Sequence, residues 1–269
     1  MRLKVHHETQ YSYEDAPSYL VQRLYLTPAN FASQKVVKWT IEAPGIDEGL
    51  RYADAAGNII HLVTTSSFEG SATIIAKGEV ETSDAAGVIR NLQGTVPEAV
   101  FLRKTPATLA DDALKAFAKP FAGKAPILER CHALMKALHE QIAYETGTSD
   151  AATTAAEAFA AKRGVCQDHA HLMIAVAREI GIPARYVTGY LVTGEGASSS
   201  AAHAWAELFV ADLGWVGFDA TNDQCPTDHY VRVAAGHDAI AVAPVRGSRR
   251  GGGGREHLTV EVRVEIAQQ

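Results

Sequence analysis

The second half of the chain contains a cysteine, a histidine and an aspartate whose positions suit nucleophilic attack on a carbonyl carbon. Cys166 begins a predicted helix that runs to about Ile180 and ends at Gly181. The free amides and positive dipole end of a helix N-terminus stabilise a thiolate and can hold the oxyanion formed in such an attack. We therefore predict that Cys166 is a nucleophile. Cys131 lies among apolar residues of another predicted helix and is interpreted as core.

A thiol nucleophile needs a base, and the base needs an acceptor that orients it. His203 begins a predicted strand, and Asp219 ends the next strand after a tight turn. A turn centred near Ala211 places the two residues opposite each other, and a register shift of two keeps them diagonal neighbours on one face. A shift of one residue separates them. The spacing thus permits His203 as the base and Asp219 as its orienting carboxylate.

A metal site is the alternative chemistry for this cysteine. His169 lies three residues after Cys166 on the same helical face, so Cys166, His169 and His203 could bind zinc. No second Cys/His pair at ligand spacing accompanies them, because Cys131 and Cys225 have no nearby partners in the sequence. We therefore favour the nucleophile and expect neither a metal nor an organic cofactor.

The elements that must position these residues fall into two regions. Residues 1–100 read as short alternating strands separated by turn signals, which predicts a sandwich-like antiparallel arrangement. Residues 106–142 carry apolar side chains at helical spacing, and Thr154 with Glu157 forms a capping box before a short helix. The helix that begins at Cys166 precedes three predicted strands. This order predicts an α+β core with an antiparallel sheet.

Three further segments have predicted roles. Residues 246–255 combine arginines and glycines and are predicted to form a mobile loop. Residues 257–266 alternate like a strand. Because chain ends often lie close together, we expect this strand to pair with the N-terminal region. The stretch from Gly194 to Ala202 is a candidate lid over His203.

The segments RGVCQDHAHL, HAWAELFV and GWVGFDATN resemble the three core motifs of the transglutaminase-like, papain-related superfamily. The resemblance covers about residues 125–225 and includes the order of the motifs. It implies that Cys166, His203 and Asp219 form a catalytic triad. It also implies the bacterial two-domain form, with a β-sandwich-like domain over residues 1–100 and a papain-like catalytic core over residues 101–245.

Two positions depart from the pattern of the family. His169 stands where such proteins often carry an aromatic residue. Animal transglutaminases use an upstream tryptophan to help bind the oxyanion, and the only upstream tryptophan here is Trp39, in the other domain. Tyr144 is therefore the candidate substitute donor, beside the amide of the nucleophile. Gln167 and Trp205 are candidate pocket residues, although core packing is the favoured role of Trp205.

The composition bounds the class of protein and its partners. Of the 269 residues, 47% are apolar and 21% are charged, which is typical of soluble globular proteins. A net charge of −6 gives no general attraction to nucleic acid or anionic membranes. The N-terminus lacks the apolar run of a secretory signal, and no later run is long enough to cross a bilayer. With few cysteines as well, we expect a cytoplasmic protein without nucleic-acid or membrane partners.

The predicted function is acyl transfer through a Cys166 thioester on a peptide or protein amide, with an amine as candidate acceptor. The same residues and intermediate serve a cysteine protease or amidase that only hydrolyses, so this alternative stays open. A third alternative, from another class, is a non-catalytic binding module that retains the fold. The sequence fixes neither the substrate nor the oligomeric state.

Overall fold

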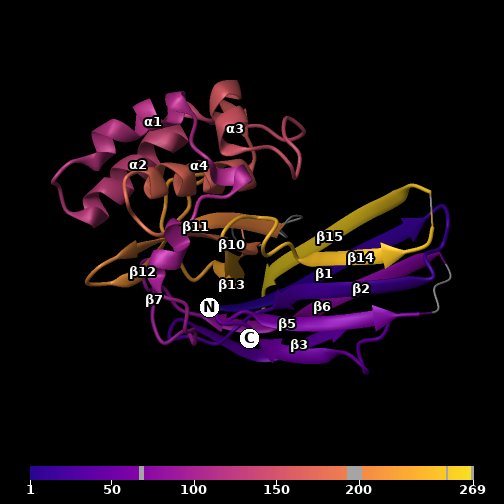
Figure 1. Ribbon diagram of the computed structural model, residues 1–269. Coiled ribbons are helices and arrows are strands. Elements are labelled where there is room, and N and C mark those ends of the chain that lie inside the picture. Colours follow the sequence, from indigo (N-terminus) through magenta and orange to yellow (C-terminus); the bar gives the residue numbers. More distant parts are fainter. Residues whose placement is uncertain (67–69, 193–201, 253, 268–269) are drawn as a thin grey trace.

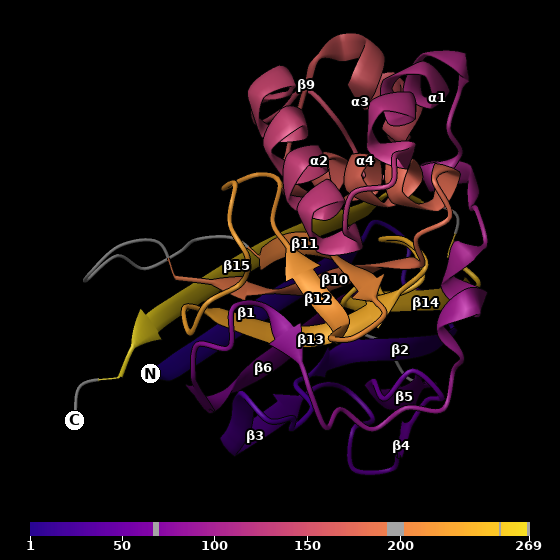
Figure 2. The ribbon, with the colours of Figure 1, turned by 90° about the vertical axis from the view of Figure 1, so that its left-hand side faces the viewer.

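The computed structural model describes residues 1–66, 70–192, 202–252 and 254–267. The helices gather on one side above a sheet, and long strands extend away from it (Figure 1). The view turned by 90° shows that the helices cover one face of this sheet while the long strands lie below it (Figure 2). The central sheet therefore lies between a layer of helices and a part of the molecule built from long strands.

The long strands form two four-stranded antiparallel sheets. The first has the order β15 (Glu256–Ile266), β1 (Arg2–Tyr13), β6 (Ser71–Thr82), β3 (Gln34–Glu42). The second has the order β14 (Val245–Arg250), β2 (Tyr19–Thr27), β5 (Ile59–Thr65), β4 (Leu50–Ala53). Apolar side chains of both sheets meet in one cluster, which contains Tyr11, Tyr13, Leu24, Leu26, Val63, Ala72, Ile74 and Ala76. The arrangement is a β-sandwich.

The alternation of β1 is reflected in its burial. The face predicted from the sequence is buried throughout, at Leu3, Val5, His7, Thr9 and Tyr11. Successive strand residues point to opposite faces, so a period of two in the sequence places one set inside.

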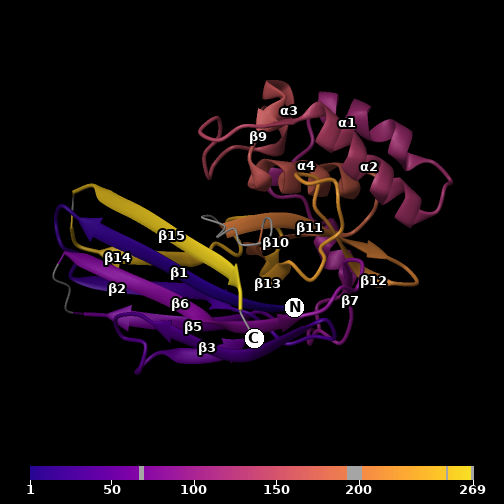
Figure 3. The ribbon, with the colours of Figure 1, turned by 180° about the vertical axis from the view of Figure 1, so that it is seen from behind.

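Strand β15 lies beside β1, with Leu3 opposite Ile266 and Tyr13 opposite Glu256. The two strands run together when the molecule is seen from behind (Figure 3). Val262 and Val264 of β15 are buried in the hydrophobic cluster that also contains Leu3 and Val5. The last strand of the chain, β15, is therefore the edge strand next to the first strand, β1.

The Arg/Gly-rich segment differs from its prediction as a mobile loop. Residues 245–250 form β14, which pairs with β2 from Val245 opposite Leu24 to Arg250 opposite Tyr19. The side chains of residues 246–250 are exposed, so no hydrophobic alternation marks the segment as a strand. Backbone pairing with a distant strand defines it instead.

The second part is a five-stranded antiparallel sheet covered by helices. Its order is β13 (Tyr230–Gly236), β10 (Ala184–Leu191), β11 (Ala202–Val210), β12 (Gly214–Phe218), β7 (Val88–Ile89). The helices are α1 (Asp112–Ala118), α2 (Ile127–Gln141), α3 (Ala155–Ala161) and α4 (Cys166–Glu179), with 3₁₀ turns at Glu98–Leu102, Pro106–Thr108 and Lys119–Ala122. A short parallel pair, β8 (Ala143–Tyr144) and β9 (Arg163–Gly164), precedes α4. The architecture is α+β.

Helix α4 is the centre of this part. It is buried from Asp168 to Arg178 and contacts α1, α2 and α3 as well as β10 and β11. Contacts with helices and with the sheet leave little of this helix exposed to solvent. Over the described residues, no helix combines the length and apolarity needed to span a bilayer. The first residue of α4, Cys166, is partly exposed.

Two buried side-chain amides join the sandwich to β13. Gln34 donates to the carbonyl of Arg232 at 2.9 Å and accepts its amide at 2.8 Å. Asn58 makes the same two contacts with Ala235, at 2.9 and 2.8 Å. Each amide thus pairs with the backbone of β13 as a neighbouring strand would.

A buried ion triad lies within the core sheet. Glu207 is paired with Arg185 at 2.5 Å and with Arg232 at 2.7 Å. Burial alone would raise the pKa of Glu207, but the charges of the two arginines outweigh it and hold the pKa at about 2. The carboxylate therefore remains ionised at neutral pH.

Glu207→Gln is expected to lower the free energy of unfolding by about 3–5 kcal/mol, because it leaves two buried guanidinium groups without a counter-charge. Urea unfolding followed by circular dichroism measures this loss. Glu42→Gln is the matched control, because Glu42 pairs with Lys77 at 2.6 Å on the surface. Its loss should stay below about 1 kcal/mol. Equal losses in the two variants would contradict the prediction.

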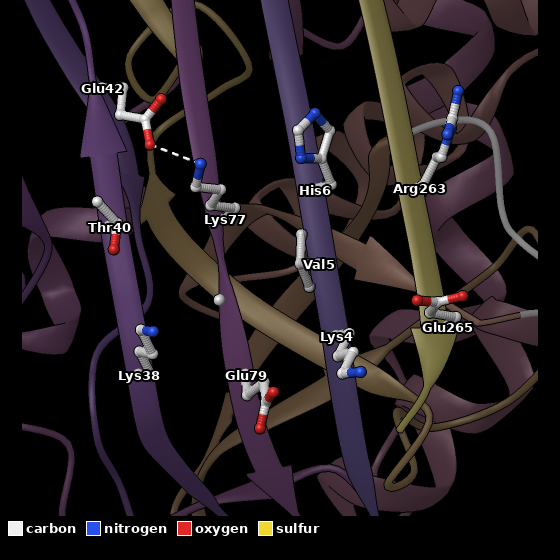
Figure 4. A pocket seen from close by; sticks show the side chains of 11 residues that line it. Lys4, Val5, His6, Lys38, Thr40, Glu42, Lys77, Glu79, Arg263 and Glu265 are labelled. Atoms are coloured by element: carbon white, nitrogen blue, oxygen red, sulfur yellow. Dashed lines mark ion pairs between the residues drawn. The ribbon is translucent and has the colours of Figure 1, made fainter. Parts of the chain in front are cut away.

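The outer face of the first sheet carries a groove of about 580 Å³ above Gly78. Its lining mixes both signs of charge, from Lys4, Lys38, Lys77, Arg263, Glu42, Glu79 and Glu265 (Figure 4). Mixed charge is typical of a solvated sheet face. The groove contains none of the cysteines.

Candidate active site

Cys166 occupies the N-terminal position of α4 that the sequence predicts. The preceding residue, Val165, is extended, and its amide donates to Oδ2 of Asp168 at 2.7 Å. The amides of Asp168 and His169 donate to the Val165 carbonyl. Within the described chain, the amides of Cys166 and Gln167 have no acceptor. The thiol therefore stands beside two free N–H groups at the positive end of a helix.

The three residues singled out from the sequence come together. Nε2 of His203 lies 2.6 Å from Oδ2 of Asp219. Cys166 also contributes to the raised pKa of His203, so its thiol lies beside the imidazole. Because Nε2 is engaged by the carboxylate, Nδ1 is the nitrogen left for the thiol. The ring of Trp205 stacks on the imidazole, with centroids 6.1 Å apart and planes at 28°. Asp219 thus holds the edge of the imidazole, and Trp205 packs against its face.

The hairpin of β11 and β12 adopts one of the two registers that the spacing permits, the one shifted by two residues. Ala206 lies opposite Phe218 and Val210 opposite Gly214, so the turn is centred at residue 212. Relative to a turn at residue 211, this is a shift of two in the pairing. Asp219 is therefore a diagonal neighbour of His203 rather than its direct partner. A shift of two preserves the face, and the carboxylate still reaches the ring.

The electrostatics favour a charged pair. Burial alone would lower the pKa of His203, but hydrogen bonds to Asp219 and Cys166 and their negative charges raise it to about 9. Burial would raise the pKa of Asp219, but His203, Asn222 and Tyr230 together lower it. At neutral pH the carboxylate is therefore ionised and the imidazole protonated, which is the state that pairs with a thiolate.

Asp219 is held by residues that the sequence analysis did not single out. Its Oδ2 accepts from Nδ2 of Asn222 and from the Tyr230 hydroxyl, both at 2.7 Å, and its Oδ1 accepts the Thr221 amide at 3.0 Å. Gln224 donates to the Tyr230 oxygen at 2.7 Å. Asn222 closes the motif GWVGFDATN and could have been found there. Tyr230 begins another strand, and nothing in its neighbourhood in the sequence connects it to Asp219.

Tyr230→Phe is expected to lower the free energy of unfolding by about 1–3 kcal/mol and to slow alkylation of Cys166 at pH 7 severalfold. The variant removes a donor to a buried carboxylate, which raises the pKa of Asp219 and weakens its hold on His203. Urea unfolding and alkylation kinetics measure the two effects. Tyr52→Phe, at an exposed tyrosine, is the control. Unchanged alkylation would limit Tyr230 to a structural role.

The three candidate pocket residues lie in different surroundings. Tyr144 is 56% exposed on β8, and its pKa is raised by partial burial and then by the charge of Cys166, which places it near the thiol. Nε2 of Gln167 donates to the carbonyl of Asp150 at 3.3 Å. Trp205 is 2% exposed, in agreement with the core role favoured for it.

His169 is committed to the backbone. Its ring nitrogens lie 3.0 and 3.1 Å from the carbonyl oxygens of Val165 and Ile142. Across the described residues, no group of three His, Cys, Asp or Glu side chains is arranged to hold a metal. The candidate lid, residues 194–202, lies outside the described residues except for Ala202.

The other two cysteines have different surroundings. Cys131 is 1% exposed in the core, and burial raises the pKa of its thiol to about 12. Burial also raises the pKa of Cys225 to about 11. A thiol reacts as its thiolate, so these two cysteines should be far less reactive than an ordinary thiol.

Comparisons with known proteins recognise both parts of the chain. Residues 115–220 match the core of the transglutaminase-like superfamily, and residues 3–81 match the bacterial transglutaminase-like N-terminal region. An uncharacterized protein of Mycobacterium tuberculosis is 30% identical over 274 residues, which are 91% of this chain and 87% of that protein. An uncharacterized protein of Mycobacterium leprae is 28% identical over 281 residues, 99% of each. A protein-glutamine gamma-glutamyltransferase of Pseudomonas aeruginosa is 32% identical over 134 residues, 44% of this chain and 18% of that protein.

A solved structure establishes the fold independently. The crystal structure of a candidate cysteine protease from Cytophaga hutchinsonii matches with a TM-score of 0.77 at 22% identity, covering 100% of this chain and 91% of that one. The fold is therefore the predicted one, with a β-sandwich followed by a papain-like core. The two family matches and the relative from Mycobacterium tuberculosis show that the chain belongs to the transglutaminase-like superfamily, in the bacterial form that carries this N-terminal region.

Proposed function

We propose that the chain is a thiol enzyme that transfers the acyl group of an amide through a thioester on Cys166. The observation that carries this proposal is the placement of Cys166 at the N-terminus of α4, beside an imidazole of His203 that is hydrogen-bonded to Asp219. A binding module has no physical need for a thiol, an imidazole and a buried carboxylate in series. The arrangement therefore supports an enzyme over the non-catalytic alternative.

In the first step, the sulfur of Cys166 attacks the amide carbonyl carbon, and the electron pair of the C=O bond moves to oxygen. The free amides of Cys166 and Gln167 are placed to bind this oxyanion. The C–N bond then breaks, and His203 gives its proton to the departing amine. Asp219 orients the ring and stabilises its charged form.

In the second step, an amine or water attacks the thioester carbon. His203 takes the proton of this nucleophile, the C–S bond breaks, and the thiolate is restored. An amine yields a new amide, and water yields a carboxylic acid. We place the hydroxyl of Tyr144 as a further donor to the oxyanion, because it lies near the thiol and is exposed to an incoming substrate.

The proposed substrate is an amide on a peptide or protein, either a glutamine side chain or a peptide bond. Partial exposure of Cys166 and the exposure of Tyr144 support access from the surface by a chain segment. The amine acceptor is proposed to enter by the same exposed side. The chemistry needs no cofactor, because thiol and imidazole supply both the nucleophile and the proton transfers.

Iodoacetamide is expected to modify Cys166 at pH 6 at least about tenfold faster than Cys131 or Cys225, and His203→Ala should remove most of this advantage. The raised pKa of His203 keeps the imidazolium present below about pH 9 and loses it as pH rises through that value. A neighbouring imidazolium favours the thiolate form of a cysteine. Mass spectrometry of each cysteine over time gives the rates. A Cys166 no more reactive than the other two would remove the proposal.

Product analysis separates transfer from hydrolysis. The enzyme is incubated with a glutamine-containing peptide and a fluorescent primary amine, with Cys166→Ala as the blank. Incorporation of the amine is the result expected of a transferase. Conversion of glutamine to glutamate without incorporation would show an amidase, and cleavage of the peptide backbone would show a protease.

A further inference from the structure

Arg185 is a buried cation with unused hydrogen-bonding capacity. Its side chain is 5% exposed, and its Nε donates to Glu207 at 2.5 Å. Nη2 is buried and has no acceptor among the described residues. A guanidinium carries five N–H donors, and a buried donor without an acceptor is unfavourable.

Arg178 shows that this fold can satisfy a buried arginine. Its Nε donates to the carbonyl of Phe101 at 2.9 Å, and Nη1 donates to the Thr108 hydroxyl at 2.6 Å. Its Nη2 donates to the carbonyls of Ala184 and His237, both at 2.8 Å. The bare Nη2 of Arg185 is therefore specific to its site.

The triad around Arg185 also carries excess positive charge. Arg185 and Arg232 share the single carboxylate of Glu207, to which Arg232 donates from Nε at 2.7 Å and from Nη2 at 3.3 Å. The three side chains are 5%, 3% and 0% exposed. Two cations and one anion leave one positive charge, and buried charge is favourable only when paired. The missing partner is an anion.

A cavity borders the side chain of Arg185. It has a volume of about 120 Å³ and is lined by Arg185, by Trp215 and by the segment that contains Asn91, Gln93 and Gly94. One water needs only about 10–15 Å³, so a small carboxylate fits with water to spare. Residues 91, 93 and 94 are exposed, which gives the cavity an opening to solvent.

Aromatic rings fix the plane of the guanidinium. Its Cζ lies 4.1 Å from the centroid of Trp215 and 5.8 Å from that of Phe101. Stacking on an aromatic face orients the planar fork, which favours carboxylates because two parallel N–H groups match two oxygens.

We propose that this cavity binds a carboxylate, with Arg185 as the anion-binding residue and Trp215 as the surface on which it stacks. Arg185 lies opposite Glu207, four residues along β11 from His203, or about 13 Å. The site is therefore separate from the candidate active site. The carboxylate can belong to a free small acid or to the C-terminus of a peptide, since both present the same group.

Thermal unfolding of the full chain tests the proposal. Sodium acetate at 100 mM is expected to raise Tm by about 2–4 °C over sodium chloride of equal ionic strength. N-acetyl-Ala-Gly is compared as free acid and as amide. A shift with the acid but not the amide identifies a chain terminus as an acceptable ligand, and a shift with acetate alone limits the site to free acids. Equal Tm values in acetate and chloride would overturn the proposal.

Two variants place the effect at the cavity. Arg185→Lys keeps the charge beside Glu207 but removes the fork, and is expected to weaken the acetate effect at least tenfold. Gln93→Glu supplies a carboxylate at the cavity rim, and is expected to raise Tm without acetate and to blunt its effect. Arg51→Lys, at an exposed arginine, is the matched control. If Arg185→Lys does not fold, Gln93→Glu decides, and an unchanged acetate shift in it would assign that shift to another part of the surface.

Discussion

Cys166→Ser is expected to lower the turnover of an amide substrate at least about 10³-fold while changing the free energy of unfolding by less than about 1 kcal/mol. A serine hydroxyl is not ionised near neutral pH. It is also a much weaker nucleophile than the thiolate that the imidazolium of His203 would stabilise. Cys166 is partly exposed at a helix end, so exchanging sulfur for oxygen disturbs little packing. Initial rates and urea unfolding measure the two quantities.

Cys225→Ser is the matched control for this substitution. Cys225 is partly exposed like Cys166 but has a thiol whose pKa is raised by burial, and it is not among the groups that shift the pKa of His203. This variant should keep the wild-type rate. Wild-type turnover in Cys166→Ser would assign the chemistry to another residue. An equal loss in both variants would show that the loss does not report on the nucleophile.

The elements that could be predicted from the sequence are those with local signals. A glycine before Cys166, an apolar run and Gly181 delimit α4 to within one residue of its observed end. The turn at Ala56-Gly57-Asn58, one of the turn signals in residues 1–100, joins β4 to β5. Gly57 has a φ of +83°, and a Cβ there would lie 1.7 Å from the carbonyl oxygen of Gln93. Glycine is required at this position by conformation and by space.

The geometry of the candidate site was predictable only up to a choice between two registers. Motif order places His203 and Asp219 on adjacent strands, and a register shift of two leaves both on one face. The support of Asp219 by Tyr230 comes from β13, and that strand is docked through Gln34, 198 residues away from Arg232 in the sequence. Strand β14 likewise exists through pairing with β2. Such contacts depend on the whole fold, so no local pattern carries them.

Asp219→Ala is expected to lower the turnover of an amide substrate by about 10²–10⁴-fold, the range that a positioned acid–base group contributes. Alanine removes the acceptor that orients His203 and leaves the donors Asn222 and Tyr230 facing an apolar side chain. Without the carboxylate charge, burial lowers the pKa of His203 below about 9, so less imidazolium is present to pair with the thiolate. Initial rates and alkylation of Cys166 against pH measure both effects.

Asp219→Asn separates orientation from charge at this position. The amide oxygen can still accept from Nε2 of His203, so the ring keeps its direction while the negative charge is lost. We expect a smaller loss than in Asp219→Ala. We also expect that the step in the pH profile of Cys166 alkylation at which His203 loses its proton moves below about pH 9. A profile unchanged from wild type would mean that the thiolate alone raises the pKa of His203. Asparagine removes the charge alone, whereas alanine removes both the charge and the acceptor that orients His203. Equal losses in the two variants would therefore mean that Asp219 acts through its charge rather than by orienting the ring.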